Sequence, residues 1–211
     1  MICIIDYKLG NIRSLVKAFN SMNGNVIVSN KYSDIKESSK LVLPGVGSFK
    51  KGMEHLRDYD LVSVLKEEVL IGNKPFLGIC LGMQLLFKNS EEDGLVEGLG
   101  FIDGEIRKFD FNSGADFKIP HMGWNNIFGG KFDSIEIFKG IEESANFYFV
   151  HSYHALLGEV LDCVYTDYGY NFVSAIQKDN IYGTQFHPEK SQKEGLKIIK
   201  NFIQLKMSDN A

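Results

Sequence analysis

The sequence of 211 residues has no long hydrophobic run and no strong excess of charge. Its longest mostly apolar stretch, FLGICLGMQLLF, falls short of the roughly 18 to 20 residues needed to cross a bilayer. The net charge is −4, from 27 acidic and 23 basic residues, with no polybasic block. We therefore expect neither a membrane nor nucleic acid as a partner. The start, MICIIDYKLG, has no basic n-region and no long apolar h-region, so we do not expect a signal peptide.

Cysteine is also scarce, since only Cys3, Cys80 and Cys163 are present. An odd number of cysteines without a secretion signal indicates reduced thiols in a cytoplasmic protein. The metal-binding patterns CxxC and HExxH do not occur in the sequence, and neither does the phosphate-binding pattern GxGxxG. We expect no metal site and no cofactor, and we do not expect this chain to hold a nucleotide itself.

The order of sequence patterns predicts one α/β domain over residues 1–205, with a frayed polar tail at 206–211. In the first third, β-branched runs at residues 1–6, 25–29, 40–45 and 75–79 alternate with helical patterns at 11–22 and 48–70. This alternation favours a mostly parallel central sheet with helices on both faces. After Gly98, short aromatic-rich segments separated by turn residues predict antiparallel strands, and a helix at 191–205 closes the fold.

The first candidate for chemistry is Cys80, in the sequence GICLG. It follows a predicted strand and precedes a helical pattern, and the glycines on each side allow a sharp turn, as in a nucleophile elbow. The N–H groups at the start of the helix, Leu81 first, could then stabilise an oxyanion. Gln84 is one helical turn further on and shares a face with Cys80. The alternative is that Cys80 is a small buried hydrophobic residue, as free cysteines often are.

A cysteine nucleophile needs a base and a group that orients the base. Of the five histidines, only His187 lies in a cluster that offers both, QFHPEK. A strand delivers the imidazole, and Glu189, two residues on, returns to the same face if the chain stays extended. The carboxylate could then fix the tautomer of the ring. The alternative is a surface loop with a helix-capping acid.

Together these motifs resemble the class I, triad-type glutamine amidotransferases. The resemblance rests on GICLGMQLLF at residues 78–87 and on the distant GTQFHPEKS at 183–191. Further segments are similar to the branch of glutaminase subunits of imidazole glycerol phosphate synthase. They are IIDYKLGNIRSL, PGVGSF, PHMGWN and FYFVHSY, so that the resemblance spans Ile4 to about Leu205. It implies the three-layer fold of that family.

The resemblance also implies roles for individual residues. Cys80, His187 and Glu189 match the catalytic triad, in which the cysteine forms a glutamyl thioester. The residues matched to substrate binding are Gln84, Glu92 for the α-ammonium, the backbone near Ser152 and Tyr153 for the carboxylate, and Gly45, Gly47 and Leu81 for the oxyanion. For Glu92 the alternative is a solvated acidic turn, and for PGVG a plain turn.

The same resemblance implies a partner, a (β/α)₈ cyclase that forms a heterodimer with this chain and receives ammonia through a channel. The residues matched to the docking face are Asn11, Trp124, Asn125, Tyr148 and Lys190. For Trp124 the alternative is a core position, and His121 and His151 are left as structural or interface residues. The products of the pair are imidazole glycerol phosphate, for histidine biosynthesis, and an aminoimidazole carboxamide nucleotide.

Two alternatives concern the function as a whole. After FVHSY the chain reads HALLGEV, where members of the branch often have an aromatic residue or arginine first. This departure leaves open a related glutaminase that supplies ammonia for amidation of a surface or flagellar sugar. The other alternative is a peptidase, chaperone or glyoxalase-type protein with a cysteine at a similar elbow. Such proteins would lack the His-Pro-Glu arrangement and would not need Gln84.

Overall fold

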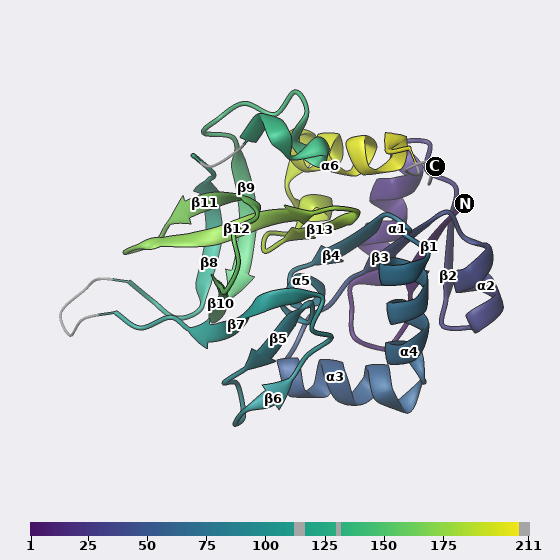
Figure 1. Ribbon diagram of the computed structural model, residues 1–211. Coiled ribbons are helices and arrows are strands. Elements are labelled where there is room, and N and C mark those ends of the chain that lie inside the picture. The colour runs from purple at the N-terminus through teal and green to yellow at the C-terminus, as the bar shows by residue number, and fades with distance from the viewer. Residues whose placement is uncertain (112–116, 130–131, 207–211) are drawn as a thin grey trace.

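The computed structural model describes residues 1–111, 117–129 and 132–206 and is built around a sheet of eleven strands (Figure 1). One half of this sheet is parallel, as predicted for the first third of the chain. Its strands run in the order β2 (Val26–Ser29), β1 (Ile2–Ile5), β3 (Lys40–Leu43), β4 (Phe76–Ile79) and β13 (Ile181–Thr184). The predicted α/β fold with a mostly parallel central sheet is confirmed.

The other half of the sheet is largely antiparallel and comes from the aromatic-rich part of the chain. Next to β13 lie β12 (Asn171–Lys178), β10 (Tyr153–Leu157), β7 (Ile102–Lys108), β5 (Phe87–Ser90) and β6 (Val96–Glu97), and β11 (Asp162–Asp167) pairs with β12. Two further strands, β8 (His121–Asn126) and β9 (Asn146–His151), form a separate antiparallel ribbon. This ribbon lies beside β10, β11 and β12, at the end of the molecule away from the chain termini (Figure 1).

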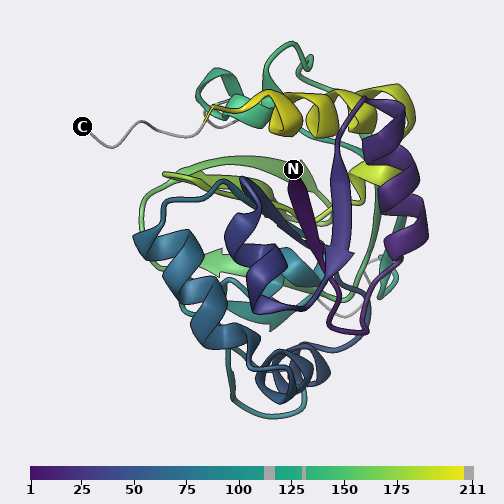
Figure 2. The same cartoon turned by 90° about the vertical axis from the view of Figure 1, so that its right-hand side faces the viewer.

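Helices cover the parallel half on both faces (Figure 2). On one face lie α1 (Ile12–Ser21) and α6 (Gln192–Gln204), and on the other α2 (Tyr32–Glu37), α3 (Phe49–Asp58) and α4 (Leu61–Lys66). Strand β1 shows why helices must cover both faces of the sheet, because its side chains alternate between two apolar cores. Ile2 and Ile4 pack in the core under α1 and α6, whereas Cys3 and Ile5 pack in the core under α2, α3 and α4.

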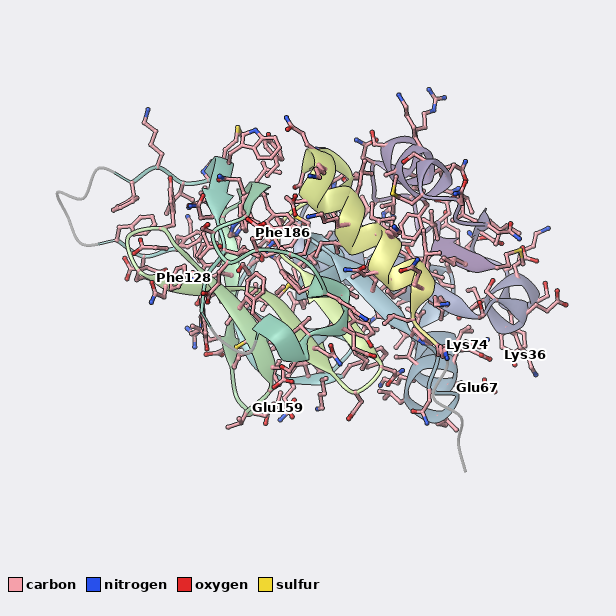
Figure 3. The ribbon with its side chains drawn as sticks, turned by 90° about the horizontal axis from the view of Figure 1, so that it is seen from above. Lys36, Glu67, Lys74, Phe128, Glu159 and Phe186 are labelled. Atoms are coloured by element: carbon pink, nitrogen blue, oxygen red, sulfur yellow. The ribbon has the colours of Figure 1, made fainter. Side chains whose placement is uncertain are left out.

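The predicted helix over residues 48–70 is interrupted, which the pattern of apolar residues did not show. Asp60 adopts a left-handed conformation with φ 55° between α3 and α4. After Lys66 the helix continues as a π-helix, η1 (Glu67–Ile71). A buried ion pair between Lys74 and Glu68, 2.5 Å from Nζ to Oε2, holds the end of this segment. Lys74 also donates to the carbonyls of Ile35 and Lys36. Figure 3 labels Lys74 and Lys36, which lie near each other.

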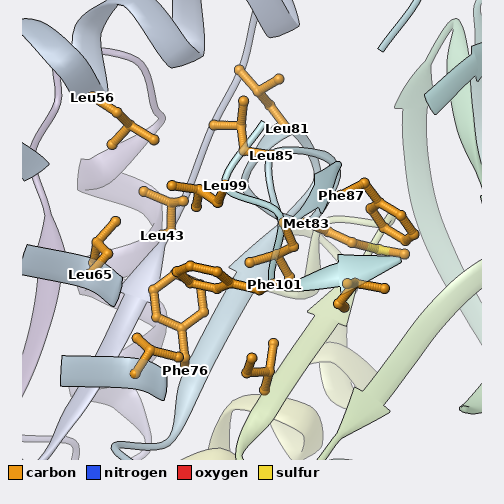
Figure 4. Packing of buried hydrophobic residues seen from close by; sticks show 14 of the residues in the cluster. Leu43, Leu56, Leu65, Phe76, Leu81, Met83, Leu85, Phe87, Leu99 and Phe101 are labelled. Atoms are coloured by element: carbon orange, nitrogen blue, oxygen red, sulfur yellow. The ribbon is translucent and has the colours of Figure 1, made fainter. Parts of the chain in front are cut away.

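The helix after Cys80, α5 (Leu81–Gln84), is anchored by apolar side chains. Leu81, Met83 and Leu85 point into the core beside Phe76 and Leu43 (Figure 4). The apolar run around Cys80 is therefore a strand, a short helix and their core contacts, and β5 begins after two turn residues.

Three short 3₁₀ turns lie between the longer elements: η2 (Phe132–Ser134), η3 (Glu136–Phe138) and η4 (Pro188–Lys190). Of the tail predicted at 206–211, all but Lys206 lies outside the described residues. Within the described ranges, no helix is both long and apolar enough to cross a membrane.

Candidate active site

The register of two parallel strands brings the predicted nucleophile and base together. Strands β4 and β13 are neighbours, with Ile79 opposite Thr184. Their carboxyl ends therefore meet at one edge of the sheet, where open α/β folds bind ligands. Cys80 directly follows β4, and its N–H donates to the Thr184 carbonyl at 2.7 Å. His187 comes three residues after Thr184 on the neighbouring chain segment.

Cys80 is at a strained turn, as predicted for a nucleophile elbow. Its φ is 53° and its ψ −108°, a combination that non-glycine residues rarely adopt. Both glycines of the motif are required by close packing. A Cβ atom on Gly82 would collide with the carbonyl oxygen of Leu43, and one on Gly78 would lie 2.7 Å from the carbonyl oxygen of Gly82. The turn therefore fits only if both positions lack a side chain.

The helix that follows Cys80 is shorter than its sequence pattern indicated. Helix α5 has four residues and ends at Gln84, after which the chain enters β5. A single turn carries only a small macrodipole, because few peptide dipoles add up. Stabilisation of negative charge at this site therefore depends on individual N–H groups at the helix start, such as that of Leu81, which have no partner within the helix.

His187 and Glu189 form a buried pair beside Cys80. The distance from His187 Nδ1 to Glu189 Oε1 is 2.9 Å, and both side chains are almost fully buried. The prediction that Glu189 returns to the same face in extended chain was wrong in its geometry. Pro188 ends the extended segment and begins the 3₁₀ turn η4, and the carboxylate contacts the ring across that turn. The backbone of His187 is fixed as well, because its N–H donates to the Tyr148 carbonyl at 2.9 Å.

The surroundings of His187 favour its protonated form. Burial lowers the pKa of this imidazole, but the interactions with Cys80 and Glu189 outweigh burial and raise the pKa to about 10. The other ring nitrogen, Nε2, is buried and makes no hydrogen bond of good geometry within the described residues. An imidazolium at this place stabilises negative charge on the sulfur atom beside it.

Two glutamines connect the sulfur atom to the wall of the site. Gln185, which precedes His187 by two residues, points its Nε2 atom at Cys80 Sγ from 3.8 Å. Its Oε1 atom accepts a hydrogen bond of 2.9 Å from Gln84 Nε2, which also donates to the Tyr153 carbonyl at 3.0 Å. Sequence reasoning selected Gln84 but missed Gln185. Because β13 and β4 are parallel neighbours, the residue after β13 faces the residue after β4, and this signal could have identified Gln185.

A cavity of about 400 Å³ opens at these residues and has a size that suits a small molecule. Eight predicted site residues line it: Gly47, Cys80, Leu81, Gln84, Glu92, Ser152, Tyr153 and His187. Four more lining residues were not predicted to bind substrate: Val46, Pro120, Val150 and His151. Gly45, in the PGVG loop at residues 44–47, does not line the cavity. It is buried against the Tyr7 hydroxyl and Leu81. Gly47, the last residue of the PGVG loop, has a φ of 110° and open space around its Cα atom.

Glu92, which also lines the cavity, is half-buried, and its carboxylate is held by the backbone. Its Oε2 atom accepts a hydrogen bond of 2.7 Å from the N–H of Phe49, the first residue of α3. Burial raises the pKa of Glu92, and the bond from Phe49 opposes that shift. A carboxylate held in this way is suited to accept a substrate ammonium group.

The residues predicted to dock a partner fall into two groups. Trp124, on β8, is half exposed with a relative accessibility of 48%, which rules out the core alternative. It packs edge-on against Tyr148, and Lys190 Nζ lies 5.6 Å from the centre of the Tyr148 ring. Asn11 is exposed before α1.

Asn125 points inward instead. Its Nδ2 atom donates to the Asp167 carbonyl at 2.9 Å and lies 3.3 Å from His121 Nε2. Strand alternation explains the difference, since neighbouring residues of β8 face opposite sides.

In the part of the chain that the structure describes, no group of three or more His, Cys, Asp or Glu residues is placed to hold a metal ion.

Comparisons with known proteins show which sequences this chain is similar to. Residues 3–205 match the family model "Glutamine amidotransferase class-I". The imidazole glycerol phosphate synthase subunit HisH 1 of Campylobacter jejuni (strain RM1221) is 46% identical, and the match covers 97% of this chain and all of that protein. The HisH subunit of Sulfurimonas denitrificans is 47% identical over 96% of this chain and 97% of its own length. That of Methanocaldococcus jannaschii is 47% identical, with 97% and 100% covered.

Solved structures show the same fold at low sequence identity. A crystal structure of a glutamine amidotransferase superimposes with a TM-score of 0.74 at 15% identity, covering 97% of this chain and 99% of that one. A structure of PurLQS from Thermotoga maritima superimposes with a TM-score of 0.69 at 18% identity, covering 95% and 96%.

Proposed function

Because this chain belongs to the class I glutamine amidotransferase family, we propose that it is the glutaminase subunit of an imidazole glycerol phosphate synthase. In this role it hydrolyses L-glutamine and passes the ammonia to a cyclase subunit. The observation that carries the proposal is the meeting of Cys80 and His187 at one cavity, with Glu189 bonded to the His187 ring behind it. The names of the three HisH relatives support the histidine pathway, and none of the three supports the sugar-modifying alternative.

The first half of the reaction forms a thioester. Cys80 Sγ, as the thiolate, attacks the side-chain amide carbon of glutamine, and the negative charge moves to the amide oxygen. In this mechanism the Leu81 N–H at the start of α5 receives that oxyanion, together with a peptide N–H of the PGVG loop when the loop is in its active state. The imidazolium of His187 then gives its proton to the leaving nitrogen, the C–N bond breaks, and ammonia departs.

The second half releases glutamate. A water molecule attacks the thioester carbon while neutral His187 takes its proton, and the C–S bond breaks to return the thiolate–imidazolium pair. Glu189 holds Nδ1 of the ring throughout, so that Nε2 remains directed at the sulfur and the leaving group.

Recognition of glutamine as a zwitterion uses both walls of the cavity. Glu92, held by the Phe49 N–H, receives the α-ammonium group. The Ser152–Tyr153 edge receives the α-carboxylate, and Gln84 lies between this edge and Cys80. The carboxylate of Glu92 at one end and backbone N–H donors at the other select a free amino acid over a glutamine within a peptide.

Coupling to a partner follows from the chemistry, since ammonia released without an acceptor would be lost. We place the (β/α)₈ cyclase on the face that carries Trp124, Tyr148 and Lys190. The PGVG loop lies at the cavity, where a peptide flip would create or remove an oxyanion donor. Such a donor is worth about 10²–10³ in rate. Docking of the cyclase would then shift the loop to its active state.

Glutamate release from glutamine by the purified chain tests this proposal. The assay is run with the chain alone, with the cyclase, and with the cyclase plus its nucleotide substrate. We expect strong release only in the complete mixture. Activation by the cyclase but not by the nucleotide would favour a different ammonia acceptor. A free chain that already works at full speed would contradict gating by the partner.

Replacing Glu189 with glutamine should lower kcat by about ten- to a hundredfold, less than a change at Cys80 or His187. The amide keeps a hydrogen bond to Nδ1 but loses the charge that helps to raise the pKa of His187. The pKa of His187 should therefore fall, which NMR titration of the imidazole can measure. A loss as large as that of the Cys80 variant would assign Glu189 a more direct role.

Replacing Trp124 with alanine should weaken binding of the cyclase by about 1 to 3 kcal/mol, because exposed aromatic anchors dominate many interfaces. Glutaminase activity of the free chain should change little. Tyr32→Ala, an equally exposed aromatic on α2, is the matched control and should leave binding unchanged. Calorimetry measures binding of the cyclase, and a basal assay measures hydrolysis by the free chain. Weaker binding with unchanged hydrolysis indicates docking, whereas lost hydrolysis would indicate a role within the active site.

A further inference from the structure

Three buried histidines of the described chain have no role in the proposed reaction. His121 on β8, His151 on β9 and His154 on β10 lie in a cluster of aromatic rings next to the cavity. His121 and His151 are directly opposite each other in the β8–β9 ribbon, and His151 also lines the cavity. Burying three imidazoles is costly unless their nitrogens are paired.

The hydrogen bonds of His151 determine its tautomer. Its Nδ1 atom lies 2.8 Å from the carbonyl oxygen of Tyr153, which can only accept, so Nδ1 carries a proton. Burial lowers the pKa of His151, the bond to the Tyr153 carbonyl opposes this shift, and the nearby His121, His154 and His187 rings add to it. Together they bring the pKa to about 3, so the ring is neutral. Its Nε2 atom is then an acceptor, and the group 3.1 Å away, His121 Nδ1, must be the donor.

The same reasoning extends to the next ring and to its amide partner. Burial lowers the pKa of His121 to about 4, so this ring is neutral too, and with its proton on Nδ1 its Nε2 atom accepts. The donor at 3.3 Å is Nδ2 of Asn125. The orientation of that amide is fixed independently, because Oδ1 accepts from the N–H of Asn126 at 2.8 Å and Nδ2 also donates to the Asp167 carbonyl.

All protons therefore point the same way, from the amide of Asn125 through two imidazoles to the carbonyl of Tyr153. This carbonyl receives a second donor, Gln84 Nε2 at 3.0 Å, so both of its lone pairs are occupied. Through Gln185 the connection continues to Cys80 Sγ.

Aromatic rings keep the two imidazoles in place. His121 is stacked between Tyr168, with ring centres 4.0 Å apart, and Phe149, with centres 4.9 Å apart. The ring centre of His151 lies 5.2 Å from that of Phe109 and 5.1 Å from that of Phe172. Rings confined in this way cannot rotate to find other partners, so the hydrogen bonds between them have a defined geometry.

We propose that His121 and His151 are positioning residues, a neutral hydrogen-bond relay from Asn125 to the Tyr153 carbonyl that holds Gln84 and the Ser152–Tyr153 edge in place for glutamine. This role rests on the proposed glutaminase function, since it concerns the same cavity. The relay itself is a property of the folded chain and can be measured without any substrate.

The first test is NMR of the wild-type chain with ¹⁵N-labelled histidine. Long-range ¹H–¹⁵N spectra report which ring nitrogen carries the proton. We expect His121 and His151 to be neutral at pH 7, each with its proton on Nδ1. A proton on Nε2 of either neutral ring, or an imidazolium at either position, would overturn the relay.

The second test compares variants in the glutaminase assay with the cyclase. His151→Leu removes the donor to Tyr153 and should raise KM for glutamine about tenfold, the worth of one buried hydrogen bond, with a smaller change in kcat. His151→Asn places an amide N–H near the position of Nδ1 and should restore KM to within about threefold of wild type. His154→Leu, a buried histidine of the same cluster without a bond to Tyr153, is the control and should leave KM unchanged.

The outcomes separate the relay from the proposed function. A merely structural role would lower the folded fraction and therefore kcat, with KM unchanged, and that result for His151→Leu would overturn the positioning role. If His151→Leu does not fold, two other results decide. They are the KM of His151→Asn relative to wild type, and the tautomers of His121 and His151 in the wild-type chain. A wild-type complex that releases no glutamate would refute the proposed function and the positioning role with it.

Discussion

Replacing Cys80 with alanine should reduce glutamine hydrolysis by about 10⁴-fold or more, because no other group can form the thioester. Alanine keeps the Cβ atom and removes only Sγ, so the elbow and its glycine contacts persist. Folding and binding of the cyclase should therefore remain as in the wild type. Glutamate release and binding of the cyclase are measured on the same preparation.

Cys3→Ala is the control for this experiment. Cys3 is also a buried free thiol, but it lies on β1 in the core under α2, α3 and α4. We expect this variant to retain activity. Loss of complex formation in Cys80→Ala would contradict a purely chemical role for the thiol.

Replacing His187 with asparagine should be nearly as severe, with a loss of about 10³–10⁴-fold in kcat. An asparagine amide could still reach Glu189, but it cannot carry the proton at Nε2. The sulfur atom loses the cation beside it, and the leaving nitrogen loses its proton donor. Steady-state glutamate release with the cyclase present measures the effect.

His154→Asn is the matched control, since it makes the same substitution at another buried histidine that is not a triad residue. Its kcat should stay close to wild type. If His187→Asn kept activity within tenfold of wild type, another group would have to act as the base, and the assignment of the triad would fail.

The sequence was sufficient for the elements of the site that lie in local motifs. GICLG predicted the strained turn at Cys80, and the need of a cysteine nucleophile for a base and an orienting acid selected His187 in QFHPEK. The parallel pairing of β4 and β13 that brings the two residues together was not predicted. Glu189 was correctly expected to contact His187, although through a 3₁₀ turn that the sequence pattern did not indicate. Pro188 was the residue in the sequence that could have indicated this turn.

What could not be predicted depends on contacts between distant segments. Pro120, Val150 and His151 reach the cavity because the β8–β9 ribbon packs beside it, and no local pattern specifies that packing. The link between His121 and His151 depends on the register of that ribbon.

Asn125 is a case in which a local signal was present but not used. A strand alternates its faces, so Trp124 and Asn125 could not both face a partner.

The most direct measurement of the central claim is covalent labelling with a glutamine-mimicking diazoketone, followed by peptide mass spectrometry. The reagent needs both a glutamine site and an activated nucleophile within it. We expect modification of Cys80 alone, prevented by excess glutamine and absent from Cys80→Ala, with Cys3 and Cys163 unmodified. Modification of another residue in preference to Cys80, or an unlabelled Cys80 in the active complex, would contradict a cysteine-based glutaminase mechanism.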